Sequence, residues 1–203
     1  MQIGPKYKIA RRLGAPIFEK TQTQKFSLSK KSQGKEGAKR PKAKSEFGRQ
    51  LIEKQKARLT YGLSERQFSK YAKAIIEKKS TKASADLFEV LERRLDNVTY
   101  RIGLATTRRF ARQMTSHGHI LVNGKKVTVP SYQLYVGDVI SIREGSLKKP
   151  LFATLDEKIK STTFPSWISF NADKKAWTVS SFPKIEGESL QFDLGAVFEY
   201  YRR

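Results

Sequence analysis

A dense run of hydrogen-bond donors and cations between residues 106 and 126 is the part of this sequence best suited to chemistry. The side chains carry hydroxyl, guanidinium, imidazole, amide and ammonium groups: Thr107, Arg108, Arg112, Ser116, His117, His119, Asn123, Lys125 and Lys126. None of them is a carboxylate. Donors and cations suit an anion such as phosphate, because each group can donate a hydrogen bond or neutralise charge. We therefore expect a phosphate-binding surface over these residues.

The same stretch makes a poor catalytic or metal site. His117 and His119 are the only histidines, and the sequence has no cysteine. Two imidazoles without a third ligand hold a metal weakly, so a turn position explains them better. No serine has an evident histidine partner, and no phosphate-cradling glycine loop is present. Asp96 and Asp138 are better explained as an ion-pair partner of an arginine and as a turn former. We expect no enzyme, no cofactor and no metal.

Residues 94–143 must position these groups, and their pattern predicts a helix, a second short helix, a hairpin and a closing strand. Thr106 or Thr107 can cap the second helix by accepting a bond from a free backbone N–H. Gly118 can end that helix in the left-handed conformation. Asn123-Gly124 between two apolar runs predicts a type I′ turn, which needs positive φ at both positions.

The stretch resembles a known family. The residues that carry the resemblance are 91–98, 116–124 and 130–133. They resemble the RNA-binding domain named after small-subunit ribosomal protein four, and more closely the family of that ribosomal protein. Residues 4–8, 11–14 and 197–203 resemble the two ends of its members, so the resemblance runs nearly end to end. In this family the second helix and the hairpin lie against rRNA, which implies the same role for the polar set above.

Composition also points to a polyanionic partner. The 203 residues include 41 Lys+Arg against 19 Asp+Glu, a formal charge of +22. Such a charge repels itself in a compact chain, so we expect a polyanion in its surroundings, nucleic acid first and an anionic membrane second. No apolar segment approaches the length of a membrane span, and the N-terminus lacks an apolar signal core. We expect a soluble cytoplasmic protein, with a plastid ribosome as the alternative home.

The region before residue 93 is predicted to be a basic arm followed by helices. We expect helices over 45–62, from a Ser64–Gln67 capping box onward, and continuously from Ser84 to Val98. Residues 20–45 are rich in Lys, Ser, Gln and Gly, so they cannot bury enough apolar area to offset their ordering entropy. They are expected to be mobile alone and ordered against RNA. Many family members carry a zinc-binding cysteine cluster here, so this sequence resembles the metal-free versions.

Further rRNA contacts are predicted among the basic residues outside this stretch. They are Lys6, Lys8, Arg11, Arg12, Lys39, Arg40, Lys42, Lys44, Arg49, Lys54, Lys56, Arg58, Arg66 and Arg94. The alternative for each is ordinary solvated charge on an outer face.

The predicted fold class is α+β in three parts. Residues 1–92 form the basic arm and helical domain, residues 93–157 the RNA-binding domain, and residues 158–203 a C-terminal extension that packs back on the body. Within the extension, the aromatic segments from 164 to 183 are expected to be short strands or extended pieces that cover the sheet.

The resemblance implies a structural component of the small ribosomal subunit. It would bind 16S rRNA directly and early, nucleate assembly of the 5′ domain, neighbour small-subunit proteins three and five, and influence decoding accuracy. Repression of its own messenger is compatible with the same surface. An RNA-modifying enzyme that borrows the domain, such as a pseudouridine synthase, would need a separate catalytic domain. A free heat-shock-type RNA binder would lack the terminal matches. No small-molecule substrate is expected.

Overall fold

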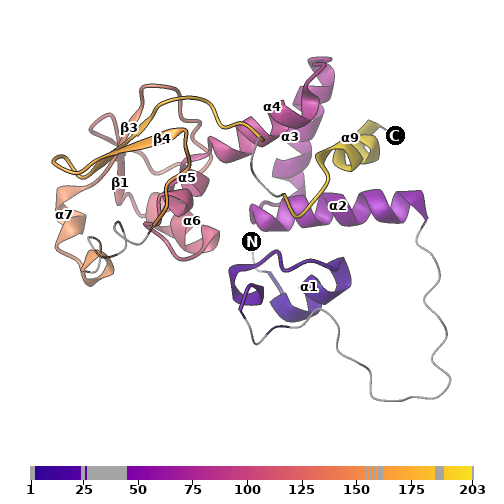
Figure 1. Cartoon of the computed structure of the whole chain (residues 1–203), viewed down its shortest axis with the longest axis horizontal. Helices are drawn as coiled ribbons and strands as arrows, with labels where there is room; N and C mark the ends of the chain where they lie inside the picture. The colour runs from indigo at the N-terminus through magenta and orange to yellow at the C-terminus, as the bar shows by residue number, and fades with distance from the viewer. Residues whose placement is uncertain are drawn as a thin grey trace. The chain divides into compact units, whose positions relative to one another are not determined.

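The computed structural model describes residues 3–23, 26, 45–153, 155, 157, 159, 162–185 and 190–202. The protein is α+β, as predicted, and divides into two compact units (Figure 1). Unit 1 contains Met1–Leu87 and Gly187–Arg203, and unit 2 contains Phe88–Glu186. The units do not follow the predicted division at residue 158, because the C-terminal segment contributes to both.

Unit 1 is helical. Its elements are α1 (Lys6–Leu13), η1 (Glu19–Thr21), α2 (Glu46–Thr60), α3 (Glu65–Glu77), the first part of α4 (Ala83–Glu92) and α9 (Leu194–Arg202). The hydroxyls of Ser45 and Ser64 cap α2 and α3 by accepting hydrogen bonds from backbone N–H groups three residues on, at 3.2 and 3.3 Å. Helix α9 packs against α2 and α3 (Figure 1), so the predicted docking of the C-terminus is confirmed.

The first residues of the predicted mobile arm are folded onto α1, which corrects that prediction for this part. Thr21 is buried, and its hydroxyl donates a 2.7 Å hydrogen bond to the carbonyl of Phe18. The ring of Phe26 stacks on that of Tyr7, with centroids 5.5 Å apart. The contact between Phe26 and Tyr7 buries apolar surface, which the overall composition of the arm did not predict. The remainder of the arm, residues 24–25 and 27–44, lies outside the described residues.

Unit 2 holds the predicted succession of two helices, a hairpin and a strand. Its elements after α4 are α5 (Leu95–Arg101), α6 (Arg108–Ser116), β1 (Ile120–Val122), β2 (Lys125–Lys126), β3 (Val139–Ile142), α7 (Glu144–Leu147), η2 (Pro150–Phe152), β4 (Ile168–Asn171) and β5 (Ala176–Val179). Thr107 is the residue that caps α6, accepting a 3.1 Å bond from the N–H of Phe110. Asn123 and Gly124 have φ of 50° and 76°, as a type I′ turn requires.

The sheet is antiparallel with strand order β2-β1-β3-β5-β4. Strands β4 and β5 were expected to cover the sheet, and instead they extend it. β3 pairs with β1 along one edge, and its other edge pairs with β5, where Ile140 lies opposite the fully buried Trp177. Pairing there satisfies the β3 edge and places Trp177 in the core with the buried side chains of α5 and α6.

The continuous helix predicted from Ser84 to Val98 is broken into α4 and α5. Arg94 is extended, with φ −65° and ψ 134°. The break occurs because this backbone pairs with the segment after the hairpin: the N–H of Leu134 donates to the carbonyl of Arg93 at 3.0 Å, and the N–H of Leu95 donates to that of Tyr132 at 2.9 Å. Long-range hydrogen bonds therefore outweigh local helix propensity.

A hydrogen-bonded charge cluster joins α9 to α2 and α3. The ammonium of Lys54 lies 2.8 Å from a carboxylate oxygen of Glu65 and 4.3 Å from the ring centroid of Tyr200. The hydroxyl of Tyr201 donates a 2.7 Å bond to the same Glu65 oxygen. Burial and this bond raise the pKa of Tyr201 far above its ordinary value, so the hydroxyl stays a donor. Burial alone would raise the pKa of Glu65, but the bonds from Lys54 and Tyr201 lower it.

Tyr201→Phe should lower the free energy of unfolding of unit 1 by about 1 kcal/mol, because it removes one hydrogen bond to a partly exposed carboxylate. Urea titration of the full chain, followed by circular dichroism, measures the change. Tyr200→Phe is the matched control, because no hydrogen bond of its hydroxyl occurs within the described residues and its ring remains over Lys54. Equal loss in both variants would contradict the role assigned to the Tyr201 hydroxyl.

Candidate nucleic-acid interface

The helix pair α5–α6 is fixed by the buried carboxylate of Asp96. Arg94 donates to both oxygens of Asp96, Nε at 3.0 Å and a terminal nitrogen at 2.8 Å, and Nε of Arg112 lies 2.8 Å from the second oxygen. The backbone N–H of Asp96 also bonds the carbonyl of Pro130 at 3.1 Å. Asp96 thus ties the start of α5 to helix α6 through its carboxylate, and to the segment after the hairpin through its backbone N–H. The predicted ion-pair role of Asp96 is confirmed.

A second buried carboxylate, Glu92, organises the other arginines of these helices. Arg101 forms two hydrogen bonds with Glu92, at 2.8 and 3.0 Å, and the amide of Asn97 donates to Glu92 at 2.9 Å. The amide oxygen of Asn97 then accepts a 2.8 Å bond from Nε of Arg108. The guanidinium of Arg108 also lies 4.4 Å from the ring centroid of Tyr100.

These networks correct two expectations about arginines. Arg94 is only 1% exposed, so it belongs to the core and is not available as an rRNA contact. Arg108 and Arg112 are half-buried and hydrogen-bonded to Asn97 and Asp96, so they are part of the fold as well as of the surface. Removing either side chain would therefore disturb the fold as well as the surface. Sequence spacing alone placed them on the polar face and gave no sign of the carboxylates behind them.

His119 is also structural. Its Nδ1 lies 2.8 Å from the hydroxyl of Ser146, and its ring meets that of Phe152 edge-on at 6.0 Å. Burial lowers the pKa of His119 below its ordinary value, and the neighbouring charges of Lys149, His117 and Arg143 lower it further. A neutral imidazole at pH 7 therefore donates or accepts one hydrogen bond within the unit.

Asn123 and Asp138 shape the hairpin edge. The side-chain amide of Asn123 donates to Asp138 at 2.7 Å, and its oxygen accepts a 2.8 Å bond from the N–H of Val139. Asp138 also accepts a 2.8 Å bond from the N–H of Tyr135, which confirms its role as a turn former. Both polar groups of Asn123 are therefore used by the protein.

An exposed polar and cationic surface remains on α6, the hairpin and the segment after β3. We call it the α6–hairpin surface: Arg109, Ser116, His117, Lys125, Lys126, Arg143, Lys148 and Lys149, all exposed. The side chain of Lys126 lies over Gly118, where an added Cβ would approach it to 2.5 Å, so hairpin and helix end are adjacent. The N–H of Arg143 bonds the carbonyl of His119 at 2.9 Å, which brings the end of β3 to the same place.

Four cations of this surface were missed from the sequence: Arg109, Arg143, Lys148 and Lys149. Asp138 and Glu144 are the only acidic residues between positions 105 and 149. This charge imbalance was visible in the sequence and signals the whole surface better than the choice of individual positions did. No cation of the surface forms an ion pair with a carboxylate in the described part of the chain.

The predicted contacts in unit 1 differ widely in exposure. Lys54 is 4% exposed and belongs to the Glu65–Tyr200 cluster, so its expected place on an outer face is wrong. Lys56 and Arg58 are half-buried and pair with Glu53 and Glu65. The partly buried Lys6 and Arg11 lie over the rings of Phe18 and Phe26, which follow α1. Four further predicted contacts are exposed: Lys8, Arg12, Arg49 and Arg66. Lys39, Arg40, Lys42 and Lys44 lie outside the described residues.

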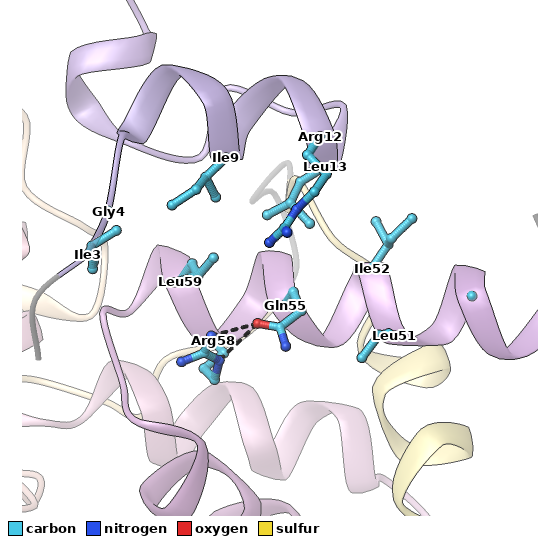
Figure 2. A pocket seen from close by; sticks show the side chains of 11 residues that line it. Ile3, Gly4, Ile9, Arg12, Leu13, Leu51, Ile52, Gln55, Arg58 and Leu59 are labelled. Atoms are coloured by element: carbon cyan, nitrogen blue, oxygen red, sulfur yellow. Dashed lines mark hydrogen bonds between the residues drawn. The ribbon is translucent and has the colours of Figure 1, made fainter. Parts of the chain in front are cut away.

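A hollow of about 700 Å³ lies between α1 and α2 (Figure 2). Its lining is mainly aliphatic, with Ile9, Leu13 and Leu59 facing one another. Its polar pair is internally satisfied, because Arg58 donates to the amide oxygen of Gln55 at 2.6 and 3.1 Å. No convergent reactive groups line it, so it does not compete as a functional site.

The described residues contain neither a membrane span nor a metal-binding cluster. None of the helices there is long and apolar enough to cross a bilayer. Nor do three His, Asp or Glu side chains converge there in a way that would hold a metal ion.

Comparison with known proteins adds a family. Residues 2–92 match the family model described as Ribosomal protein S4/S9 N-terminal domain, and residues 93–140 match the S4 domain. The chain is 40% identical over 200 residues to small ribosomal subunit protein uS4 of Levilactobacillus brevis, which covers 98% of each chain. The chain belongs to the uS4 family. The uS4 proteins of Streptococcus thermophilus (42% over 202 residues, 98% of this chain and 97% of the relative) and Halothermothrix orenii (40% over 205, 98% of each) match similarly.

The two uS4-family matches meet between residues 92 and 93, where α4 ends. All the residues of the α6–hairpin surface up to Lys126 lie inside the S4-domain match, and Arg143, Lys148 and Lys149 lie just beyond it. The uS4 family is one of ribosomal structural proteins and not of enzymes, which removes the RNA-modifying enzyme as an alternative.

Asp96→Asn should destabilise unit 2 by about 3 kcal/mol or more, because it leaves the buried Arg94 without a counter-charge. Denaturant titration monitored by the fluorescence of Trp167 and Trp177, both buried in unit 2, measures the loss. Asp173→Asn makes the same chemical change at an exposed turn and should cost little. An Asp96→Asn variant as stable as that control would contradict the role of the carboxylate.

The stability of unit 2 should fall as the pH drops through 6.5, the ordinary pKa of histidine. Because His119 has a lowered pKa when folded, the unfolded chain binds its proton more readily. The contribution of His119 to the unfolding free energy is complete above pH 6.5. It is lost as the pH falls from that value to the lower pKa of the folded state. His119→Gln should flatten this part of the pH profile of the unfolding free energy, whereas His117→Gln should leave it. An unchanged profile in His119→Gln would refute the assignment.

Proposed function

We propose that the protein binds 16S rRNA in the small ribosomal subunit through the α6–hairpin surface. The observation that carries the proposal is the gathering of exposed cations from α6, the hairpin and the end of β3 on one surface within unit 2, none of which pairs with an acid among the described residues. Membership of the uS4 family, whose relatives are named as small-subunit proteins, supports the choice of rRNA as the polyanion.

Phosphate is the group that this surface fits best. Lys125 and Lys126 supply mobile point charges from the hairpin, while Arg109 supplies a guanidinium that can bind phosphate through two donors. Ser116 and His117 add donors at the end of α6. Contacts of this kind fix the position of RNA without reading its sequence, which suits a protein that recognises the shape of a folded RNA.

Buried polar side chains hold the neighbouring arginines in place for the same task. Arg112 is held through Nε by Asp96, and Arg108 is held through Nε by Asn97. A guanidinium fixed in this way loses less side-chain entropy when its remaining nitrogens meet a phosphate, so the contact costs less to form. Arg108 and Arg112 therefore stay in the proposed contact set, with a structural role beside it.

The finer roles rest on family resemblance alone. We propose that the protein binds early and nucleates assembly of the 5′ domain, neighbours small-subunit proteins three and five, and influences decoding accuracy. Binding to its own messenger would use the same surface. The basic residues Lys39, Arg40, Lys42 and Lys44 are proposed to join the rRNA contact through phosphates.

Lys126→Gln and Arg109→Gln should each weaken binding to a transcript of the 16S rRNA 5′ domain by roughly five- to tenfold, because each removes one phosphate contact. The slope of log Kd against log salt should also shrink by about 0.7 to 0.9 for each lost contact, since fewer counterions are released. Filter binding at several salt concentrations measures both quantities.

Lys78→Gln is the matched control. Lys78 is an exposed lysine of unit 1 that follows α3 beside Glu77 and lies outside the proposed contact set. The RNA affinity and the salt slope of the Lys78→Gln variant should equal those of the wild type. Wild-type affinity and slope in the Lys126→Gln, Arg109→Gln double variant would move the RNA contact to another surface.

A further inference from the structure

We infer that Arg93, Tyr135 and Phe182 form a stacking platform for an unpaired base of the bound RNA. We call these three residues the aromatic platform. The inference rests on the proposed function and adds a second kind of contact to it: a flat π-surface that takes a base, beside a cationic surface that takes phosphates.

The platform has the geometry that base stacking needs. The guanidinium carbon of Arg93 lies 4.6 Å from the ring centroid of Tyr135 and 4.5 Å from that of Phe182. Despite these contacts the Tyr135 side chain is 59% exposed and that of Phe182 is 40% exposed. Aromatic rings that pack against a guanidinium and still remain this exposed do not belong to a folded core, and they indicate a binding surface.

The platform is rigid before any ligand arrives. Nε of Arg93 donates a 2.7 Å bond to the carbonyl of Leu134, and a terminal nitrogen of Arg93 lies 2.7 Å from Glu89. The backbone of Tyr135 is held in turn by Asp138, which accepts its N–H at 2.8 Å. Little conformational entropy remains to be lost when a base stacks on the platform, and this favours binding.

The position of the platform favours RNA over a protein partner. Asp138 bonds both the N–H of Tyr135 and the amide of Asn123, so the platform begins at the hairpin turn that leads directly to Lys125. An RNA strand whose phosphates follow the hairpin would therefore bring its bases within reach of Tyr135. Aromatic rings and guanidinium planes are the groups on which proteins stack splayed-out bases.

Tyr135→Ala and Tyr135→Trp test the platform in the full-length protein with the 16S rRNA 5′-domain transcript. Tyr135→Ala should weaken binding about tenfold at every salt concentration, with the salt slope unchanged, because stacking releases no counterions. Tyr135→Trp should restore affinity, since indole stacks at least as well. Chemical probing should show one unpaired base that is protected by the wild type and by Tyr135→Trp, and reactive with Tyr135→Ala.

The other outcomes separate this inference from the proposed function. Wild-type affinity for Tyr135→Ala, together with weaker binding of Lys126→Gln, would overturn the platform and leave the phosphate surface standing. Failure of the wild type to bind the transcript would overturn both. If Tyr135→Ala instead lost a neighbouring protein from reconstituted subunits without a change in RNA affinity, the platform would be a protein interface and the inference would be wrong. Thermal melting of each variant shows that it is folded.

Discussion

The bidentate pair between Arg94 and Asp96 is the interaction on which unit 2 depends. Isolated in the interior, either charge would cost several kcal/mol of desolvation, so each side chain enforces the presence of the other. The pair sits where α4 ends and α5 begins, and it interrupts a sequence that otherwise favours one long helix. The carboxylate of Asp96 also accepts from Arg112 and so positions α6, while the backbone N–H of Asp96 donates to Pro130 and positions the chain after the hairpin.

This arrangement separates two uses of positive charge. Arginines that face buried acids, such as Arg94 and Arg101, hold the unit together. Among the described residues, lysines and arginines on the α6–hairpin surface pair with no such acids and leave a concentrated positive potential. A protein with a formal charge of +22 repels itself, and acids placed under the surface offset part of that repulsion without neutralising the exposed cations.

Local signals in the sequence predicted local structure well. The Thr107 cap, the Asn123-Gly124 turn and the Ser64 cap each depend on residues a few positions apart, and all three are present. Predictions failed where a distant residue decides. Lys54 is buried because Tyr200, far along the chain, lies over its ammonium, and the helix breaks at Arg94 because residues 130–134 pair with it.

The candidate site shows the same division. Its charge and its placement on α6 and the hairpin could be predicted, because polar spacing along a helix and across a hairpin is a local property. The buried groups that anchor Arg108 and Arg112, the amide of Asn97 and the carboxylate of Asp96, could not be predicted, since no periodicity reveals which polar side chains turn inward. The aromatic platform likewise joins Arg93 to Phe182. In the sequence Arg93 precedes all five strands and Phe182 follows them, so only the folded chain brings the two residues together.

The most direct test of the account is cleavage of 16S rRNA by a hydroxyl-radical source tethered to the α6–hairpin surface. The sequence has no cysteine, so Ser116→Cys gives a single attachment point at the end of α6. In a complex that retains wild-type affinity, the account predicts strong, localised cuts in the 5′ domain from an iron chelate at this position. Full affinity with no cleavage from position 116 would show that RNA lies elsewhere, and would contradict the account.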